Sequence, residues 1–194
     1  MFITVLSALI CFGLMPGAQA VGPAVPDTAI AGGNTADGYL ALLNLNGGFY
    51  NSAFGVFSLL SLTDASFDTG VGAGALLSDN GGTNTAVGAG ALINNLVASD
   101  NNAFGAFALL NNDSSGSGLA DFNNAHGRNA LFSNVDGDEN DAFGDDSMEE
   151  NTTGSQNTAM GDDSLDANTT GNFNTAIGVG ALGGNTIGSN NTNC

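Results

Sequence analysis

Two pairs of adjacent acids form the clearest pattern of residues that could carry chemistry. Asp145-Asp146 and Asp162-Asp163 lie 17 residues apart, from 145 to 162. If these segments stack as neighbouring parallel strands, the two pairs lie about 5 Å apart. Carboxylates that close repel one another unless water, protons or a cation compensates, and Ca²⁺ prefers oxygen ligands of this kind. The spacing therefore predicts either a calcium site formed by the four carboxylates or a solvated acidic strip.

The remaining candidates for chemistry are weaker. Asp136 to Asn140 resembles a calcium loop only in part, because Asp141 and Ser147 stand where such a loop needs Gly and Glu. His126 and Arg128 are the only histidine and the only basic residue of the chain. The sequence shows no Ser–His–Asp order beside a nucleophile motif, no supported Cys–His pair and no phosphate loop. We therefore expect a protein that is not an enzyme and assign no catalytic residue.

The two cysteines, Cys11 and Cys194, leave three interpretations open. If an N-terminal signal is removed, Cys194 becomes a lone thiol of an exported protein, which suggests a disulfide between two chains. If the N-terminus is kept, Cys11 of one subunit could pair with Cys194 of another. Cys194 could also be a free thiol without a role.

Charge excludes one class of partner. The chain of 194 residues has a formal net charge of −18, with a single Lys or Arg, so we exclude nucleic acid as a direct partner. Hydrophobic residues make up 42%, which argues against a disordered acidic tail. Of the 19 acids, six precede residue 111 and 13 follow it. The acidic residues therefore gather in the C-terminal half.

A repeated phrase positions all of these residues: Asn-Thr-Ala-X-Gly-X-X-(Ser/Ala)-Leu. Its glycines are spaced 16 or 17 residues apart, with one spacing of 22. Nine copies at a nearly constant period indicate a repeat architecture. The copies open at Asn34, Asn51, Asp68, Asn84, Asn101, Asn123, Asn140, Asn157 and Asn174, and their glycines are Gly38, Gly55, Gly72, Gly88, Gly105, Gly127, Gly144, Gly161 and Gly178.

The composition of the phrase favours strands over helices. A unit of 17 residues is too short for a helix pair, and Gly, Asn and Thr are poor in helix interiors. Asn and Gly tolerate the left-handed backbone of tight corners, and so few large apolar residues can form a core only if units stack. The sequence therefore predicts an all-β fold: a β-solenoid of about nine coils, in which the Asn column passes amide hydrogen bonds between coils.

The columns of the repeat also predict which side chains are buried. We expect one buried row of Leu92, Leu109, Leu165 and Leu182, and a second of Val87, Phe104, Met160 and Ile177. Alternation places the hydroxyl column inward with the second row, so we interpret that column as structural rather than as an array for ice or a glycan. Its members are Thr35, Ser52, Thr69, Thr85, Thr158 and Thr175. Residues just after the glycine, such as Phe57 and Phe107, either form an exposed apolar face or pack under turns.

The phrase also resembles a known group of repeats. Asn-Thr-Ala-Ile-Gly, followed by Ala-Leu and by the spacer Thr169 to Asn172, resembles repeats of bacterial surface proteins and phage tail-fibre-like proteins. It is similar to the head repeat of trimeric autotransporter adhesins, and this resemblance implies a β-roll. The resemblance covers about residues 34–182. The sequence has no heptad stalk, membrane-anchor barrel or C-terminal chaperone domain, which departs from a complete autotransporter or tail fibre.

The chain divides into four expected parts. Residues 1–20 are an apolar segment ending in Ala-Gln-Ala, either a secretory signal or a retained N-terminal segment; it has no positive charge before the apolar run. Residues 21–33 are a Pro-containing lead-in. Residues 34–182 form the solenoid, from which residues 111–122 bulge as a loop. Residues 183–194 are expected to form a polar tail.

These features predict an extracellular protein, secreted or at the cell surface. Our first expectation is a structural subunit that joins copies of itself head-to-tail into a filament of a surface or biofilm matrix. The alternative is an adhesin or tail-fibre-like head module that presents a repetitive face to a glycan or surface. If the protein is a structural subunit, the purified chain should form filaments. If it is an adhesin-like module, the purified chain should form discrete particles.

Overall fold

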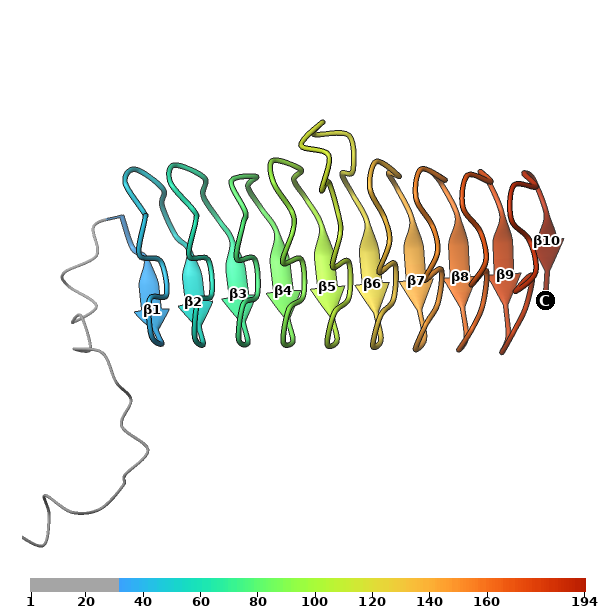
Figure 1. The fold of residues 1–194 in the computed structure, drawn as a ribbon, viewed down its shortest axis with the longest axis horizontal. Coiled ribbons are helices and arrows are strands. Elements are labelled where there is room, and N and C mark those ends of the chain that lie inside the picture. The colour runs from blue at the N-terminus through green and yellow to red at the C-terminus, as the bar shows by residue number, and fades with distance from the viewer. Residues whose placement is uncertain (1–31) are drawn as a thin grey trace, which may run out of the picture.

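A single parallel sheet runs the whole length of the computed structural model, which describes residues 32–194. The sheet contains ten short strands in sequence order, and each strand pairs with the next (Figure 1). This arrangement confirms the predicted β-solenoid. The strands are β1 (Thr35–Asp37), β2 (Ser52–Phe54), β3 (Thr69–Val71), β4 (Thr85–Val87), β5 (Asn102–Phe104), β6 (Asn124–His126), β7 (Asp141–Phe143), β8 (Thr158–Met160), β9 (Thr175–Ile177) and β10 (Thr192–Asn193).

The register repeats without slippage, because like residues of the phrase lie opposite one another. Thr158 pairs with Thr175, and Ala159 pairs with Ala176. The 22-residue spacing does not disturb this order, since Ala103 still pairs with Ala125. The extra residues of 111–122 leave the coil as a loop between β5 and β6 (Figure 1), as expected.

Left-handed backbone closes each coil. Around β2 the non-glycine residues at these corners are Tyr50, Phe57 and Leu59, with φ of 58°, 62° and 52°. The glycine of the phrase is required for a second reason. At Gly88, where φ is +145°, an added Cβ would lie 2.3 Å from the carbonyl oxygen of Gly105 in the next coil. The coils can stack closely only where this position carries no side chain.

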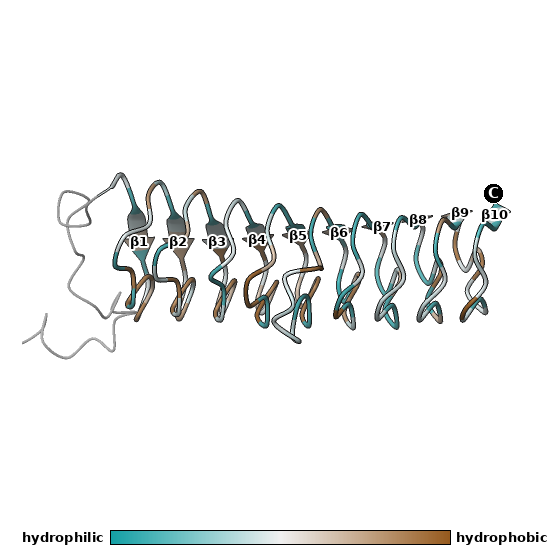
Figure 2. Cartoon of the chain, turned by 90° about the horizontal axis from the view of Figure 1, so that it is seen from above, coloured by the Kyte–Doolittle hydropathy of each residue, from teal (hydrophilic) through white to brown (hydrophobic). Residues whose placement is uncertain are grey.

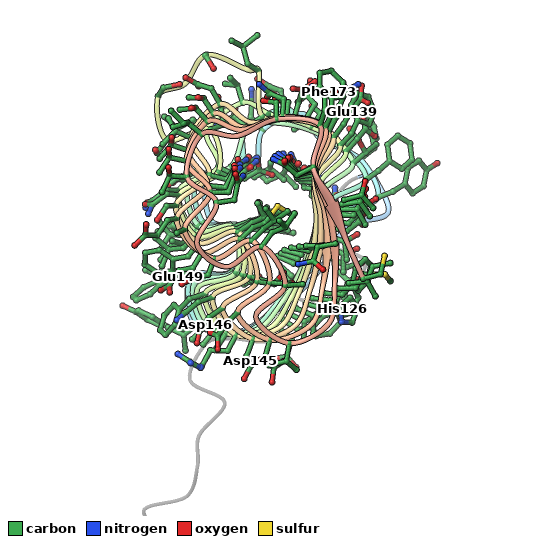
Figure 3. The ribbon with its side chains drawn as sticks, turned by 90° about the vertical axis from the view of Figure 1, so that its right-hand side faces the viewer. His126, Glu139, Asp145, Asp146, Glu149 and Phe173 are labelled. Atoms are coloured by element: carbon green, nitrogen blue, oxygen red, sulfur yellow. The ribbon has the colours of Figure 1, made fainter. Side chains whose placement is uncertain are left out.

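Two buried polar columns line the interior (Figure 3). The strand-side column lies four residues before each glycine and consists of Asn34, Asn51, Asp68, Asn84, Asn101, Asn123, Asn140, Asn157, Asn174 and Asn191. Its side chains link the coils as predicted: the backbone N–H of Asn51 donates to Asn34 Oδ1 at 2.8 Å, and its Nδ2 donates to the Ala65 carbonyl at 3.0 Å.

The second polar column, which we did not predict, lies seven residues after each glycine. Amide side chains donate directly along it, for example from Asn151 Nδ2 to Asn134 Oδ1 at 2.9 Å. Leu45 and Leu62 occupy this column in the first two coils. We call its polar part the turn-side column: Asp79, Asn95, Asn112, Asn134, Asn151, Asn168 and Asn185.

The leucine row is buried as expected, and the second apolar row is not. Leu92, Leu109 and Leu165 have no exposed surface, and Leu182 is partly buried. The prediction for Val87, Phe104, Met160 and Ile177 is wrong: Val87 is half-buried, and the other three are 38%, 44% and 45% exposed. The alanine before each of them points inward instead, because the interior of so short a coil has room there only for a methyl group. The Thr column shares the outer face, so its predicted inward orientation is also wrong.

The segment expected as a polar tail continues the solenoid. Asn185 and Asn191 extend both polar columns, and β10 pairs with β9 through Thr192 and Asn193. Its Gly and Asn content, which we interpreted as irregular, is the composition of the coil itself. The predictions for residues 1–20 and most of the lead-in lie outside the described residues. Seen from above, the coils form an elongated rod (Figure 2).

Candidate functional site

The predicted acid pairs do meet on the surface of the rod, at the corner that follows β7 and β8. Asp145 and Asp146 lie one coil before Asp162 and Asp163, and Figure 3 shows Asp145 and Asp146 pointing outward. Their carboxylates accept hydrogen bonds along the rod. The backbone N–H of Asp145 donates to Asp162 Oδ1 at 3.3 Å, and the backbone N–H of Arg128 donates to Asp145 Oδ1 at 2.9 Å.

Asp146 has protein partners for both oxygens. Arg128 Nη2 donates to Asp146 Oδ2 at 2.8 Å, and Asn129 Nδ2 donates to Asp146 Oδ1 at 2.9 Å. Within residues 32–194, no group of three or more His, Cys, Asp or Glu is arranged to hold a metal ion. Calcium binding here stays a prediction. A chelator that lowers the melting temperature, with Asp162→Asn removing that effect, is the result that would establish it.

Further acids extend this strip, and sequence reasoning did not single them out. Burial and the neighbouring charges of Asp146 and Asp166 raise the pKa of Glu149, while Arg128 opposes the shift. Burial and the charges of Glu150, Asp163 and Asp146 likewise raise the pKa of Asp166. The signal was available, because Glu149 and Asp166 hold the same repeat position, five residues after the glycine.

An apolar row runs along the outer face of the sheet, one residue before each glycine. His126, singled out for its chemistry, belongs to this row. Its ring stacks between Phe104, at a centroid distance of 4.8 Å, and Phe143, at 5.7 Å. We call the row the outer apolar row: Phe54, Val71, Val87, Phe104, His126, Phe143, Met160 and Ile177.

Asp37 holds this position in the first coil, but from Phe54 to Ile177 the outer apolar row contains no acid, whereas the chain as a whole has a net charge of −18. Phe57 and Phe107, just after the glycines, add further exposed rings at a neighbouring corner, so of the two interpretations left open for this position the exposed apolar face is the observed one. The rod therefore offers apolar surface along one side and acids at another corner of its C-terminal half.

The insertion loop is held by Asp113, which lies within it, and by Asp136 of the next coil. Ser115 Oγ and Ser117 Oγ donate to Asp136 Oδ1 at 2.6 and 2.7 Å, and these bonds hold the pKa of Asp136 below its usual value. Asp113 Oδ1 accepts the backbone N–H of Gly118 at 2.8 Å. These acids therefore serve to order the loop.

Cys194 is an exposed free thiol at the end of β10, whereas Cys11 lies outside the described residues. No helix between residues 32 and 194 is long and apolar enough to span a membrane. Comparison with known proteins adds no relative: no family model, curated protein or solved structure matches the chain.

Proposed function

We propose that this chain is an extracellular structural protein whose solenoid extends by head-to-tail stacking of copies. The observation that carries the proposal is the repeated contact between coils. Each coil offers the next the same kinds of group: the backbone N–H of the first strand residue, the side-chain oxygen of an Asn or Asp, and a glycine without a side chain. The last described coil offers them as well, at Thr192, Asn191 and Gly178.

The hydrogen bonds of earlier coils define what a stacked copy would have to supply. Thr158 N–H donates to the Asn174 carbonyl and Thr175 N–H donates to the Asn191 carbonyl, each at 2.8 Å. Thr192 holds the same position in β10, at the edge of the described sheet. An Asn carbonyl at the corresponding position of a stacked copy is the acceptor that this pattern requires.

The glycines at this end are also open. A Cβ added at Gly178 or Gly180 meets nothing within 4 Å, whereas at Gly161 it would lie 2.5 Å from the carbonyl carbon of Gly178. The turn-side column would not continue into a second copy, because Leu45 holds that position in the first coil. The strand-side column and the backbone must therefore form most of the junction.

Charge favours head-to-tail contact over other arrangements. The acids gather in the C-terminal half, yet none follows Asp166, so the terminal coil is uncharged. With one Arg in the chain, complementary charge cannot drive assembly, and backbone pairing must do so. A repeated heterologous contact of this kind produces fibres rather than closed dimers.

Export rests on the apolar residues 1–20 and their Ala-Gln-Ala end, and N-terminal sequencing of the exported protein tests it.

Electron microscopy of the purified full chain tests the assembly, and two variants make the test specific. Gly178→Ala places a methyl group where every earlier coil receives a carbonyl, so we expect filaments to be lost. Gly180→Asn is the matched control, because Asn129, Asp146 and Asp163 occupy the same column in internal coils. We expect this control to assemble.

Thr192→Pro provides a second block, since it removes the open N–H but leaves the bonds of Asn193 toward β9. Circular dichroism must show that each variant keeps its β-structure. Folded wild-type protein that remains monomeric at high concentration would overturn the filament proposal.

One observation favours the alternative, an adhesin-like binding module. The outer apolar row presents side chains at the strand spacing of about 4.8 Å, as a repetitive binding face would. If the chain is such a module, the purified protein should form discrete particles that bind a surface or glycan array. The double variant Phe104→Ser, Phe143→Ser should lose this binding. Both side chains lie on the outer face, so the double variant should still fold.

A further inference from the structure

Two aspartates replace amide side chains in the buried columns of one coil. Asp68 stands in the strand-side column between Asn51 and Asn84, and Asp79 begins the turn-side column. Neither side chain has any exposed surface. An acid that is buried without a cation carries a large desolvation cost in its charged form.

Asp68 makes only half of the contacts that an asparagine makes at this position. Its Oδ1 accepts the backbone N–H of Asn84 at 2.9 Å, as Asn51 Oδ1 accepts the N–H of Asp68 at 2.8 Å. Its Oδ2 is buried and has no hydrogen-bond partner among residues 32–194. This oxygen replaces the Nδ2 that elsewhere donates a hydrogen bond.

The repeat identifies the carbonyl to which a protonated Asp68 would donate a hydrogen bond. Asn84 Nδ2 donates to the Ala98 carbonyl at 2.9 Å, and Ala98 lies seven residues before Gly105. In the coil of Asp68, the residue seven before the glycine is Gly81. A carboxylate oxygen facing this carbonyl would be repelled, whereas a protonated one donates a hydrogen bond as the amide does.

Asp79 has the opposite set of partners. Its Oδ1 accepts from Asn95 Nδ2 at 2.6 Å and from the Gly81 N–H at 3.1 Å, and Asn84 Nδ2 lies 3.3 Å from the same oxygen. Leu62, one coil earlier in this column, can accept no hydrogen bond. Burial and the charge of Asp68 raise the pKa of Asp79, and the hydrogen bonds from Asn95, Gly81 and Asn84 oppose this shift. Because donors surround Asp79 whereas Asp68 Oδ2 has none in the described part of the chain, the geometry puts the negative charge of the pair on Asp79 and the proton on Asp68.

Among residues 32–194, no other charged side chain faces the pair. The coil before it contributes Asn51 and Leu62, and the coil after it contributes Asn84 and Asn95, all of them uncharged. Asp64 of the preceding coil is exposed. The single basic residue, Arg128, pairs with Asp146 three coils further along.

We propose that Asp68 and Asp79 form a pH-dependent contact between coils, in which the proton on Asp68 controls how firmly this coil packs on its neighbours. With a proton on Asp68, the strand-side column runs unbroken through this coil. When that proton is lost, two buried charges and an unfavourable contact with the Gly81 carbonyl loosen the packing of the coil on its neighbours. The coils of β1 to β3 then become less firmly held to the rest of the rod.

The way in which folding stability changes with pH follows from the proton that Asp68 keeps in the folded state. Burial raises the pKa of Asp68 from 3.8 to about 7, opposed by its bond from Asn84. The folded state therefore keeps a proton that the unfolded chain releases. Stability from this group is complete below pH 3.8, falls as pH rises toward 7, and falls no further above it. A shift of this size changes the folding equilibrium by up to about a thousandfold.

The test compares unfolding by urea at pH 5 and pH 8 for the full chain and two variants. Asp68→Asn supplies the missing Nδ2 at every pH. We expect its folding equilibrium constant to exceed that of the wild type by at least about tenfold at pH 8 and by much less at pH 5. Asp64→Asn removes the same charge from an exposed site in the neighbouring coil, and it should keep the pH dependence of the wild type.

A direct readout identifies the protonated acid. Infrared spectra of the wild type between pH 5 and pH 7 should contain the carbonyl band of a neutral carboxylic acid, and Asp68→Asn should lack it. The proposal is overturned if Asp68→Asn is less stable than the wild type at pH 8, if Asp64→Asn changes the pH profile equally, or if the infrared band persists in Asp68→Asn.

Discussion

At the scale of single residues, this rod depends on side chains that are polar and buried. An asparagine in the strand-side column accepts a backbone N–H from the next coil and donates to a carbonyl, so one side chain satisfies groups in two coils. Asn140 does this with Asn157 at 3.1 Å and with Gly154 at 2.8 Å. Buried polar groups are costly when unpaired, so a repeated column of paired asparagine side chains also specifies the register.

The leucine row supplies most of the apolar core, and Leu109 tests its contribution. Leu109 is fully buried between the leucines of neighbouring coils. We expect Leu109→Ala to lower the free energy of unfolding by about 2–5 kcal/mol, because the stacked coils cannot close the cavity. Phe104→Ala, on the outer face, should cost clearly less in the same urea titration. Equal losses would contradict the assignment of inner and outer rows.

The acidic strip predicts a small effect that salt removes. Glu149 is partly buried beside Asp146 and Asp166, which raise its pKa. Glu149→Gln should therefore raise the free energy of unfolding above neutral pH, by at most about 0.5 kcal/mol at low ionic strength. The difference should shrink in high salt, because screening weakens repulsion between exposed charges. A gain that is independent of salt would point to packing rather than charge.

At the scale of the coil, the sequence alone predicted the repeat period, the strands and the column of glycines. It also predicted the leucine row, because a large residue that recurs after the same glycine has few other places to go. It failed at the residues before the glycine. Phe104 and Ile177 are large and alternate with alanine, but alternation alone cannot tell which face is inside when the inner face admits only alanine.

The candidate sites were harder to predict for a related reason. Asp68 reads as a conservative change from asparagine in the repeat, and only the geometry shows that its second oxygen lacks a partner. Asp145 and Asp162 were placed together correctly because they share a column. Arg128, which donates to Asp145 and Asp146, and Asn129, which donates to Asp146, were missed, because one coil had to be stacked on the next to bring them into contact.

The glycine column gives a paired prediction at this scale. Gly88→Ala places a Cβ 2.3 Å from the Gly105 carbonyl oxygen, at a φ of +145°. We expect a loss of about 3 kcal/mol or more, or failure to fold, since both neighbouring backbones are fixed. Gly178→Ala in the unassembled protein meets no atom within 4 Å and should cost about 1–3 kcal/mol from backbone strain alone. Thermal unfolding of the two variants distinguishes them.

At the scale of the whole molecule, each coil contacts only the coils beside it, so stability should be nearly a sum over coils. Deleting residues 158–174 removes one complete period and joins Asn157 to Thr175, a junction already present between Asn174 and Thr175. We expect a folded rod that is shorter by about 4.8 Å. Deleting residues 158–165 instead breaks the register and should unfold the C-terminal coils. Small-angle scattering and circular dichroism measure both outcomes.

Head-to-tail assembly predicts insensitivity to salt at this same scale. The junction we propose consists of backbone pairing and one Asn column, and high salt screens charges without weakening such contacts. Filament length and mass should therefore be unchanged or greater in high salt, as measured by sedimentation and microscopy. Dissociation on adding salt would indicate a junction held by charge, which contradicts the proposed interface.

The direction of the strands has a mechanical consequence. The strands lie across the rod, so their hydrogen bonds run along its length (Figure 1). A force that pulls the two ends apart therefore loads one coil's bonds after another, as in peeling, rather than all bonds together in shear. Each released coil of 17 residues can extend to roughly 55–60 Å of chain in place of about 5 Å of rod. Such a rod lengthens stepwise under tension, one coil at a time, rather than breaking all at once.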